Sequence, residues 1–322
     1  LSAQIAEALG SKYGFPLGHR EGVHLDDGFH IVEFEEDSEG NEVAVRKGFV
    51  RVSKTGNNVE DPTSFTYANQ LLGSKVSEGT VVMEHPRLGM QARFNMGMTV
   101  GSVIKAEHTT LNPAAIYLPG LAGINVLENE VNSQLTGNLL FSYNAAAVIG
   151  VSQTFLDLDI GFGIPMFALE DLNDEATAAP FVLSPYFGVT KKFGGRTYFS
   201  GTFGLGVDML NLAGVYTYSY YGLSEDYDFL VSVMAPGAKF GGEAGMMITP
   251  DILLVASVNY KLGLAPLGGT VQLGDYDPVE FADLMTYEDL NLGGLTIQIG
   301  AAYELGELPI DIFGFLDPFK KH

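Results

Sequence analysis

The sequence has no cysteine and no tryptophan, and it is poor in charge. The absence of cysteine excludes disulfides, thiolate nucleophiles and cysteine-ligated zinc sites. Charged residues make up 17% of the chain, against about 25% in an average soluble domain. There are 17 Lys and Arg residues and the formal net charge is −22, so nucleic acid is not an expected partner.

Long hydrophobic runs are also missing. No apolar run reaches the roughly 18 residues that a membrane-spanning helix needs, so we expect no helical membrane span. Barrel strands, in which every second residue is polar, would give no signal in such a scan. The sequence starts at Leu1 rather than Met, so either the chain has been shortened or a signal peptide has been removed, and the second is what we expect of an envelope protein.

The chain contains instead a series of alternating apolar and polar residues. In the stretch FLDLDIGFGIP at 155–165, the even-numbered residues 156–164 are all apolar, whereas the odd-numbered residues 157–163 are Asp and Gly. An alternation with a period of two places an apolar medium on one side of the strand and water on the other. Similar alternation recurs at 90–100, 135–149, 197–209, 237–248, 252–263 and 295–305. These segments are long enough for tilted strands to cross a bilayer.

Two surroundings suit such strands: a soluble or self-assembling β-sheet, and a membrane barrel with a wet lumen. The polar parity is rich in Gly, Ser, Thr and Asn rather than in Lys and Glu, which favours the barrel. We therefore predict an all-β fold, namely an antiparallel transmembrane β-barrel of about 12 strands, with a range of 8–14. An even number of strands is expected, because bacterial barrels usually have one. Weaker strand candidates lie at 181–193, 215–222, 229–234 and 310–315, and outward loops are expected at 166–180, 212–236 and 264–294.

The first 88 residues are more charged than the rest of the chain, which predicts a separate region. Residues 1–18 carry apolar residues at helical spacing between Ser2 and Gly10, which predicts a short helix. Residues 29–53 predict a hairpin that turns at 38–41. We therefore divide the chain into 1–88, a helix plus a small soluble β module with a periplasmic or assembly role, and 89–322, the barrel.

Residues 92–115, ARFNMGMTVGSVIKAEHTTLNPAA, resemble the N-terminal signature of the outer-membrane fatty-acid transporter superfamily and its relatives in secretion and gliding systems. The matching positions are Ala92, Arg93, Met96, Gly97, Asn112, Pro113 and Ala114. The resemblance implies an outer-membrane barrel and the transport of apolar molecules. Gly97 would permit close backbone approach, and Asn112-Pro113 would force a turn.

Few residues predict specific chemistry. Eight polar residues are expected to line the lumen and set its selectivity: Asp157, Asp159, Lys239, Glu243, Asn259, Lys261, Gln298 and Glu304. The acidic loop 273–291 contains possible oxygen ligands for Ca²⁺, namely Asp275, Asp277, Glu280 and Asp283, although a solvated acidic loop explains them as well. The cluster His19, His24, His30, Asp26 and Asp27 matches no metal-ligand spacing, and we predict no metal site or other cofactor.

Two functions remain open from the sequence. The first is a passive channel or transporter for small molecules in the bacterial outer membrane, with the lipid bilayer as its surroundings. The second is a structural protein of the envelope or cell surface whose N-terminal module mediates self-association or docking to a larger complex; a homo-oligomer or an envelope complex is expected with either. We expect no enzyme, because no nucleophile, base and orienting residue occur at a recognisable spacing.

Overall fold

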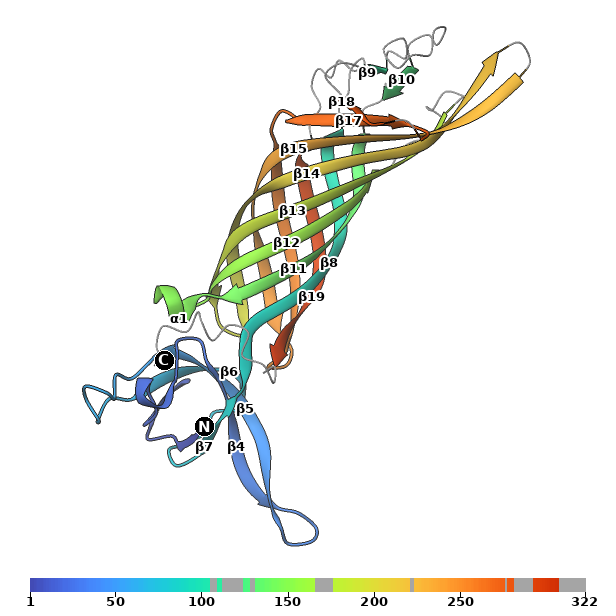
Figure 1. Ribbon diagram of the computed structural model, residues 1–322. Coiled ribbons are helices and arrows are strands. Elements are labelled where there is room, and N and C mark those ends of the chain that lie inside the picture. Colours follow the sequence, from blue (N-terminus) through green and yellow to red (C-terminus); the bar gives the residue numbers. More distant parts are fainter. Residues whose placement is uncertain are drawn as a thin grey trace.

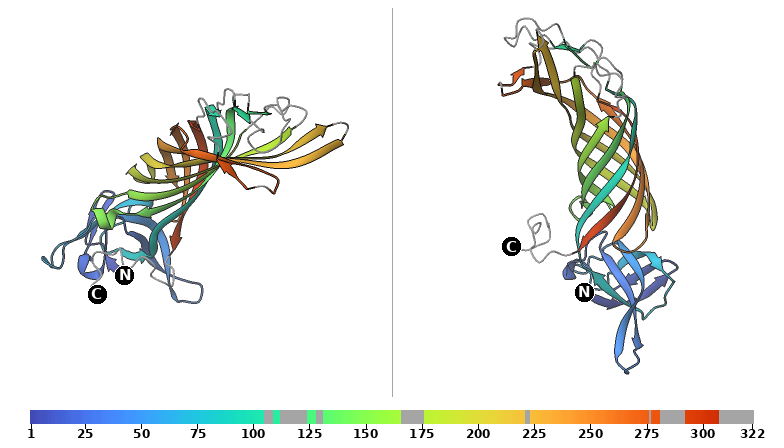
Figure 2. Two further views of the ribbon diagram at one scale, coloured as in Figure 1. Left: turned by 45° about the horizontal axis from the view of Figure 1, so that its top comes forward. Right: turned by 90° about the vertical axis from the view of Figure 1, so that its right-hand side faces the viewer.

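The protein consists of a small β module and a β-barrel joined end to end, as a computed structural model shows (Figure 1). The structure describes residues 1–104, 109–111, 124–127, 131–165, 176–220, 223–275, 277–280 and 292–306. Figure 2 shows that the module lies at one end of the barrel in each view. The sheet of the module ends at His85, and the first barrel strand begins at Arg87.

The N-terminal module is a seven-stranded antiparallel sheet that curls around its own core. In spatial order its strands are β1 (Ser2–Gln4), β7 (Val81–His85), β4 (Gly28–Glu36), β5 (Glu42–Lys54), β6 (Thr66–Gly73), β3 (Lys12–Phe15) and β2 (Glu7–Leu9). The outermost strands β1 and β2 are consecutive halves of one segment, which therefore joins the two edges of the sheet. Buried apolar residues fill the curl: Ile5, Tyr13, Phe15, Leu17, Val23, Phe29, Ile31, Val50, Val52, Ala68 and Val82.

The helix expected within residues 1–18 is wrong, because this segment forms β1, β2 and β3. Ile5 N–H donates to the Thr80 carbonyl, and Ala6 N–H donates to the Gly14 carbonyl. A short isolated helix is marginal in water, whereas pairing with two existing sheet edges satisfies the same backbone groups. The one helical turn nearby is a 3₁₀ turn, η1 (His19–Glu21).

The barrel has eight antiparallel strands. They are β8 (Arg87–Ile104), β11 (Val131–Asn144), β12 (Thr154–Pro165), β13 (Ala176–Gly194), β14 (Thr197–Tyr220), β15 (Leu223–Met247), β16 (Ile252–Gly263) and β19 (Gly294–Gly306). Pairing of β19 with β8 closes the ring. Beyond the barrel, β17 (Gly268–Leu273) pairs with β15 and with β18 (Val279–Glu280), and β9 (Thr109–Leu111) pairs with β10 (Ile124–Leu127).

The barrel has fewer strands than the expected 12, and its eight strands are the lower limit of the predicted range of 8–14. The candidates at 215–222 and 229–234 are not separate strands but parts of β14 and β15, which run for 24 and 25 residues and form one long hairpin. The expected loop at 212–236 therefore belongs to this hairpin. The alternating run at 135–149 also ends earlier than expected, because the strand stops at Asn144 and the helical turn α1 (Ala146–Ile149) follows. The candidate at 310–315 lies outside the described residues.

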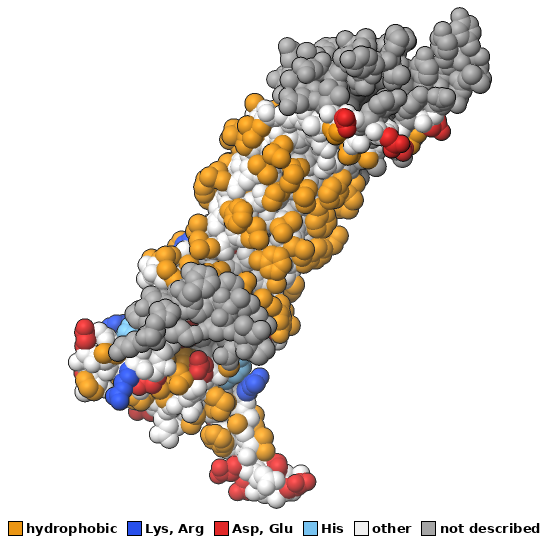
Figure 3. Space-filling view, viewed as in Figure 1, with side chains coloured by type: hydrophobic (Ala, Val, Ile, Leu, Met, Phe, Trp, Pro, Cys, Tyr) orange, Lys and Arg blue, Asp and Glu red, His pale blue; other side chains and the backbone are white. Residues whose placement is uncertain are grey.

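Apolar side chains gather on the outer face of the barrel seen in Figure 3, as predicted from the alternation, and exposed apolar side chains occur on all eight strands. Exposed examples are Phe94, Met98, Leu139, Leu156, Phe187, Phe203, Leu205, Phe240, Leu254, Val258, Ile297 and Ile299. Polar side chains of the opposite parity are buried inside, among them Asn95, Thr99, Gln134, Asn138, Asp157, Asp159, Asn259 and Gln298. An apolar outer surface around a polar interior is the arrangement of a barrel in lipid. Within the described residues, no helix has the length and apolarity to cross a membrane.

Candidate functional site

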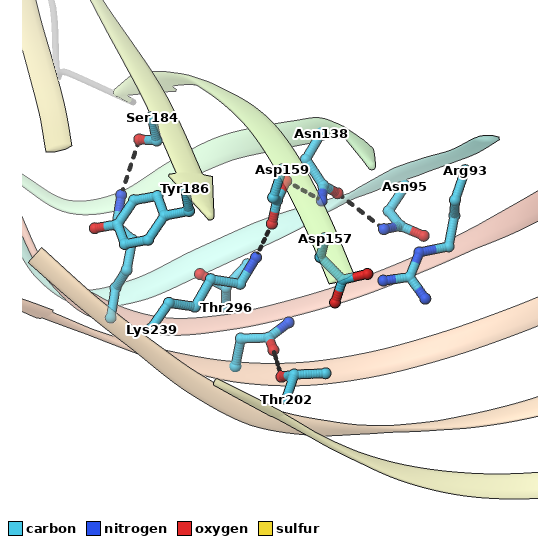
Figure 4. Close-up of polar contacts among 12 residues, drawn as sticks. Arg93, Asn95, Asn138, Asp157, Asp159, Ser184, Tyr186, Thr202, Lys239 and Thr296 are labelled. Atoms are coloured by element: carbon cyan, nitrogen blue, oxygen red, sulfur yellow. Dashed lines mark hydrogen bonds and ion pairs between the residues drawn. The ribbon is translucent and has the colours of Figure 1, made fainter. Parts of the chain in front are cut away.

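Polar side chains from opposite walls meet in the middle of the barrel (Figure 4). Asn95 Nδ2 on β8 donates to Asn138 Oδ1 on β11 at 2.9 Å, and Asn138 Nδ2 donates to Asp159 Oδ1 on β12 at 2.6 Å. Lys239 on β15 forms an ion pair with the same Asp159 carboxylate. Strand β15 is not a neighbour of β12 in the ring, so this chain of contacts crosses the lumen.

A second ion pair crosses the lumen between Arg93 on β8 and Glu243 on β15. The Arg93 side chain is 10% exposed and the Glu243 side chain 1%, so both charges are removed from bulk water. Such a pair is held by mutual attraction at the cost of desolvation, and removing one partner leaves an uncompensated buried charge. Nearby, the Thr190 hydroxyl donates to the Asp157 carboxylate.

Lys192 occupies the interior close to the module end of the barrel. Its Nζ donates to Gln91 Oε1 at 2.8 Å, and Gln91 in turn donates to the Glu304 carboxylate. The same ammonium lies 4.3 Å from the ring centroid of Phe155 and 4.9 Å from that of Tyr198. Aromatic faces attract a cation electrostatically, so Lys192 is held by two rings as well as by a hydrogen bond.

Nearer the opposite end, Asp208 forms the centre of a third cluster. Its carboxylate pairs with Lys261 and accepts hydrogen bonds from Ser184 Oγ and from Tyr186 OH, the latter at 2.7 Å. Lys261 Nζ also lies 3.1 Å from Ser184 Oγ. The Asp208 side chain is fully buried, so this carboxylate is satisfied within the protein.

Charges inside the described barrel nearly balance. The cations are Arg93, Lys192, Lys239 and Lys261, and the carboxylates are Asp157, Asp159, Asp208, Glu243 and Glu304. Four cations and five carboxylates give these interior side chains a net charge of −1, compared with −22 for the whole chain. Two cavities of about 40 and 30 Å³ lie among these side chains, and each is large enough for a few water molecules at roughly 10–15 Å³ apiece. The described interior is thus crossed by several paired polar groups, and a barrel of eight strands is just wide enough for side chains to occupy it.

The eight predicted lumen residues all lie in this interior. The carboxylates and lysines take part in the clusters above or accept a hydrogen bond from a neighbour, Asn259 Oδ1 accepts from Thr202 Oγ1 at 3.3 Å, and Gln298 lines both cavities. The sequence prediction missed Asp208, Lys192, Gln91, Asn95 and Asn138. Asp208 shares the parity of Ser200 and Thr202, so the same alternation was a signal for it.

The other predicted site residues are dispersed. Ala92, Arg93, Met96 and Gly97 lie on β8, where Arg93 points inward and Met96 is exposed on the outer surface. Asn112, Pro113, Ala114 and Asp283 lie outside the described residues, as does the side chain of Glu280. Asp275 and Asp277 are exposed. No group of three or more potential metal ligands occurs within the described part of the chain.

The module is fixed to the barrel by polar and apolar contacts. The Asp26 carboxylate accepts hydrogen bonds from Asn144 Nδ2, Ser152 Oγ and Gln153 N–H. His85 Nε2 lies 2.6 Å from Asp251 Oδ1 in the turn between β15 and β16. Phe49 and Leu71 of the module pack with Met247 at the end of β15. These contacts hold the module at one mouth of the barrel.

Comparison with known proteins identified solved structures with low sequence similarity. A major outer membrane protein from Thermus thermophilus is 13% identical, with a TM-score of 0.45 and coverage of 67% of this chain and 98% of that one. The outer membrane protein OprG from Pseudomonas aeruginosa is 11% identical, with a TM-score of 0.38 and coverage of 69% and 99%. The outer membrane protease OmpT from Escherichia coli is 11% identical, with a TM-score of 0.34 and coverage of 94% and 96%.

No family model matches the sequence, and no curated protein matches it. The strand pairing defines the fold. An even-numbered, closed antiparallel barrel with an apolar outer surface is the architecture of bacterial outer-membrane proteins. The protein is an outer-membrane β-barrel.

Proposed function

We propose that the protein is a closed membrane anchor that holds its N-terminal module at the periplasmic surface, where the module docks to an envelope complex or to another copy. The observation that carries this proposal is that ion pairs such as Arg93–Glu243 and Lys239–Asp159 join opposite walls of the described lumen. A pore for small molecules needs an open path, and these pairs lie across it.

The length of the connections supports a periplasmic position of the module. At the module end, strands are joined by the short segments 145–153, 195–196 and 248–251. At the other end, the connections between β8 and β11 and between β16 and β19 are much longer. Outer-membrane barrels have short periplasmic turns and longer extracellular loops. The module end is therefore the periplasmic end in this proposal.

The channel function has less support. The sequence resemblance at 92–115 would imply passage of apolar molecules, yet the interior described here is lined by charged and amide side chains. An apolar solute would have to break several buried ion pairs to enter, which is costly. We therefore place the anchoring and docking function first, without catalytic activity.

Ion conductance in planar bilayers tests the proposal. Because the lumen is filled, we expect the purified full chain to insert without producing discrete single-channel steps. Insertion is verified separately by the mobility difference between boiled and unboiled samples in gel electrophoresis. Stable ohmic steps from protein that passes this check would overturn the anchor and favour the channel.

A further inference from the structure

The turn between β11 and β12 differs from the other short turns of the barrel. Residues 145–153, AAAVIGVSQ, contain no charged side chain, whereas the turns at 195–196 and 248–251 contain Arg196 and Asp251. Ala145 and Ala146 are buried, while Val148, Ile149 and Val151 are 51%, 50% and 48% exposed. The turn thus packs its small residues inward and leaves its three largest apolar side chains exposed.

This turn has a fixed shape. Ala146 N–H donates to Asn144 Oδ1 at 2.9 Å, and Gly150, in the left-handed region with φ 70°, caps the C-terminal end of α1. Ser152 and Gln153 donate to the Asp26 carboxylate of the module. The exposure of the apolar residues is therefore a consequence of a defined backbone, braced from the module on one side and from the barrel on the other.

The apolar turn is continuous with the lipid-facing surface. It projects sideways from the barrel wall at the module end (Figure 1). Leu156 on β12, Phe193 on β13 and Phe199 on β14 are 52%, 60% and 72% exposed on the outer surface. Lys191 Nζ lies 5.7 Å from the Phe193 ring centroid. The Lys191 side chain has an apolar stem and a cationic end, and such a side chain suits the boundary between acyl chains and phosphate headgroups.

We infer that Val148, Ile149 and Val151 form a membrane-surface anchor that inserts into the headgroup and acyl boundary of the leaflet on the module side. Its partner is the lipid itself. Because the same turn binds Asp26, the anchor also fixes the module against the membrane surface. The inference depends on the barrel spanning the bilayer and is independent of whether the lumen conducts.

Fluorescence quenching of a single-cysteine variant tests this inference. The native chain has no cysteine, so Ile149→Cys gives one labelling site for the fluorophore NBD in the full-length protein. In phosphatidylcholine and phosphatidylglycerol vesicles, we expect lipids carrying a doxyl group near the headgroup to quench this label more strongly than lipids carrying it deep in the chain. We expect aqueous iodide to quench it several-fold less than a label at an exposed site of the module.

Ser38→Cys supplies that exposed site, because Ser38 lies in the turn of the β4–β5 hairpin, which points away from the barrel (Figure 1). Strong iodide quenching at both sites would overturn the inference. Protection of Ile149 from both iodide and doxyl lipids would also overturn it, since a protein surface would then cover the turn. Both substitutions are at exposed positions, and correct folding is verified by the mobility shift on boiling.

Discussion

Gly97→Ala is expected to lower the free energy of unfolding by about 3 kcal/mol, at the upper end of the range for inserting a group into a packed site. Gly97 lies on β8, opposite Gln298 of β19, at the seam that closes the barrel. A Cβ at this position would overlap the Ile297 carbonyl oxygen and lie 2.7 Å from the Gln298 Cα. Because both atoms are backbone, the two strands must separate to accept it.

Urea unfolding in detergent micelles, followed by circular dichroism, measures this effect. Gly201→Ala is the matched control, because a Cβ there would have no atom within 4 Å. We expect Gly201→Ala to unfold like the native protein. Equal stability of the Gly97 and Gly201 variants would contradict the close approach at the β8–β19 seam.

Glu243→Gln is expected to destabilise the barrel by about 3–5 kcal/mol, the usual effect of removing one partner from a buried ion pair. The substitution keeps the shape of the side chain but leaves Arg93 without its countercharge. Replacing both partners, Arg93→Met with Glu243→Met, removes the unpaired charge and should recover most of the lost stability. The same unfolding assay on the single variants Arg93→Met and Glu243→Met and on the double variant gives the coupling energy of the pair.

Lys47→Met provides the contrasting case on the module. Lys47 pairs with Glu35 on the exposed β4–β5 hairpin, where water competes with the ion pair. We expect no measurable change in the unfolding of the barrel. A cycle in which the Arg93–Glu243 coupling is as small as that of an exposed pair would show that the lumen is hydrated rather than filled.

The sequence was sufficient to predict the direction of side chains in the barrel. In 155–165 the alternation places Leu156 outside and Asp157 and Asp159 inside, as the structure confirms. The outer-membrane barrel class and its antiparallel sheet follow from the same pattern. This success has a simple cause, because two different solvents on the two sides of a strand impose a period of two on every strand.

Strand number and strand length were less predictable. The sequence between 212 and 236 contains Gly, Pro and charged residues, which usually mark loops, yet β14 and β15 continue through it as one hairpin. Alternation weakens where strands extend beyond the lipid. The first nine residues were predicted as a helix because helical and strand patterns are not distinct over so few residues, and the partner strands β3 and β7 decide the outcome.

The ion pairs across the lumen could not be predicted from the local pattern. Alternation shows that Lys239 and Asp159 face inward, but their pairing depends on the width of the ring and hence on the number of strands. With the strand number open between 8 and 14, the width of the lumen was open as well. Arg93 was recognised through its place in a sequence signature, whereas its partner Glu243 lies 150 residues away.

A cysteine scan along β14 tests the central claim most directly. Single cysteines at 199, 203 and 205 replace outward Phe199, Phe203 and Leu205, and those at 200, 202 and 204 replace inward Ser200, Thr202 and Gly204. Spin labels on the first set are expected to be broadened by lipid-soluble oxygen, while the second set resists both oxygen and a water-soluble nickel reagent. Absence of this alternation, or free access of the nickel reagent to the inward set, would contradict a lipid-facing barrel with a filled lumen.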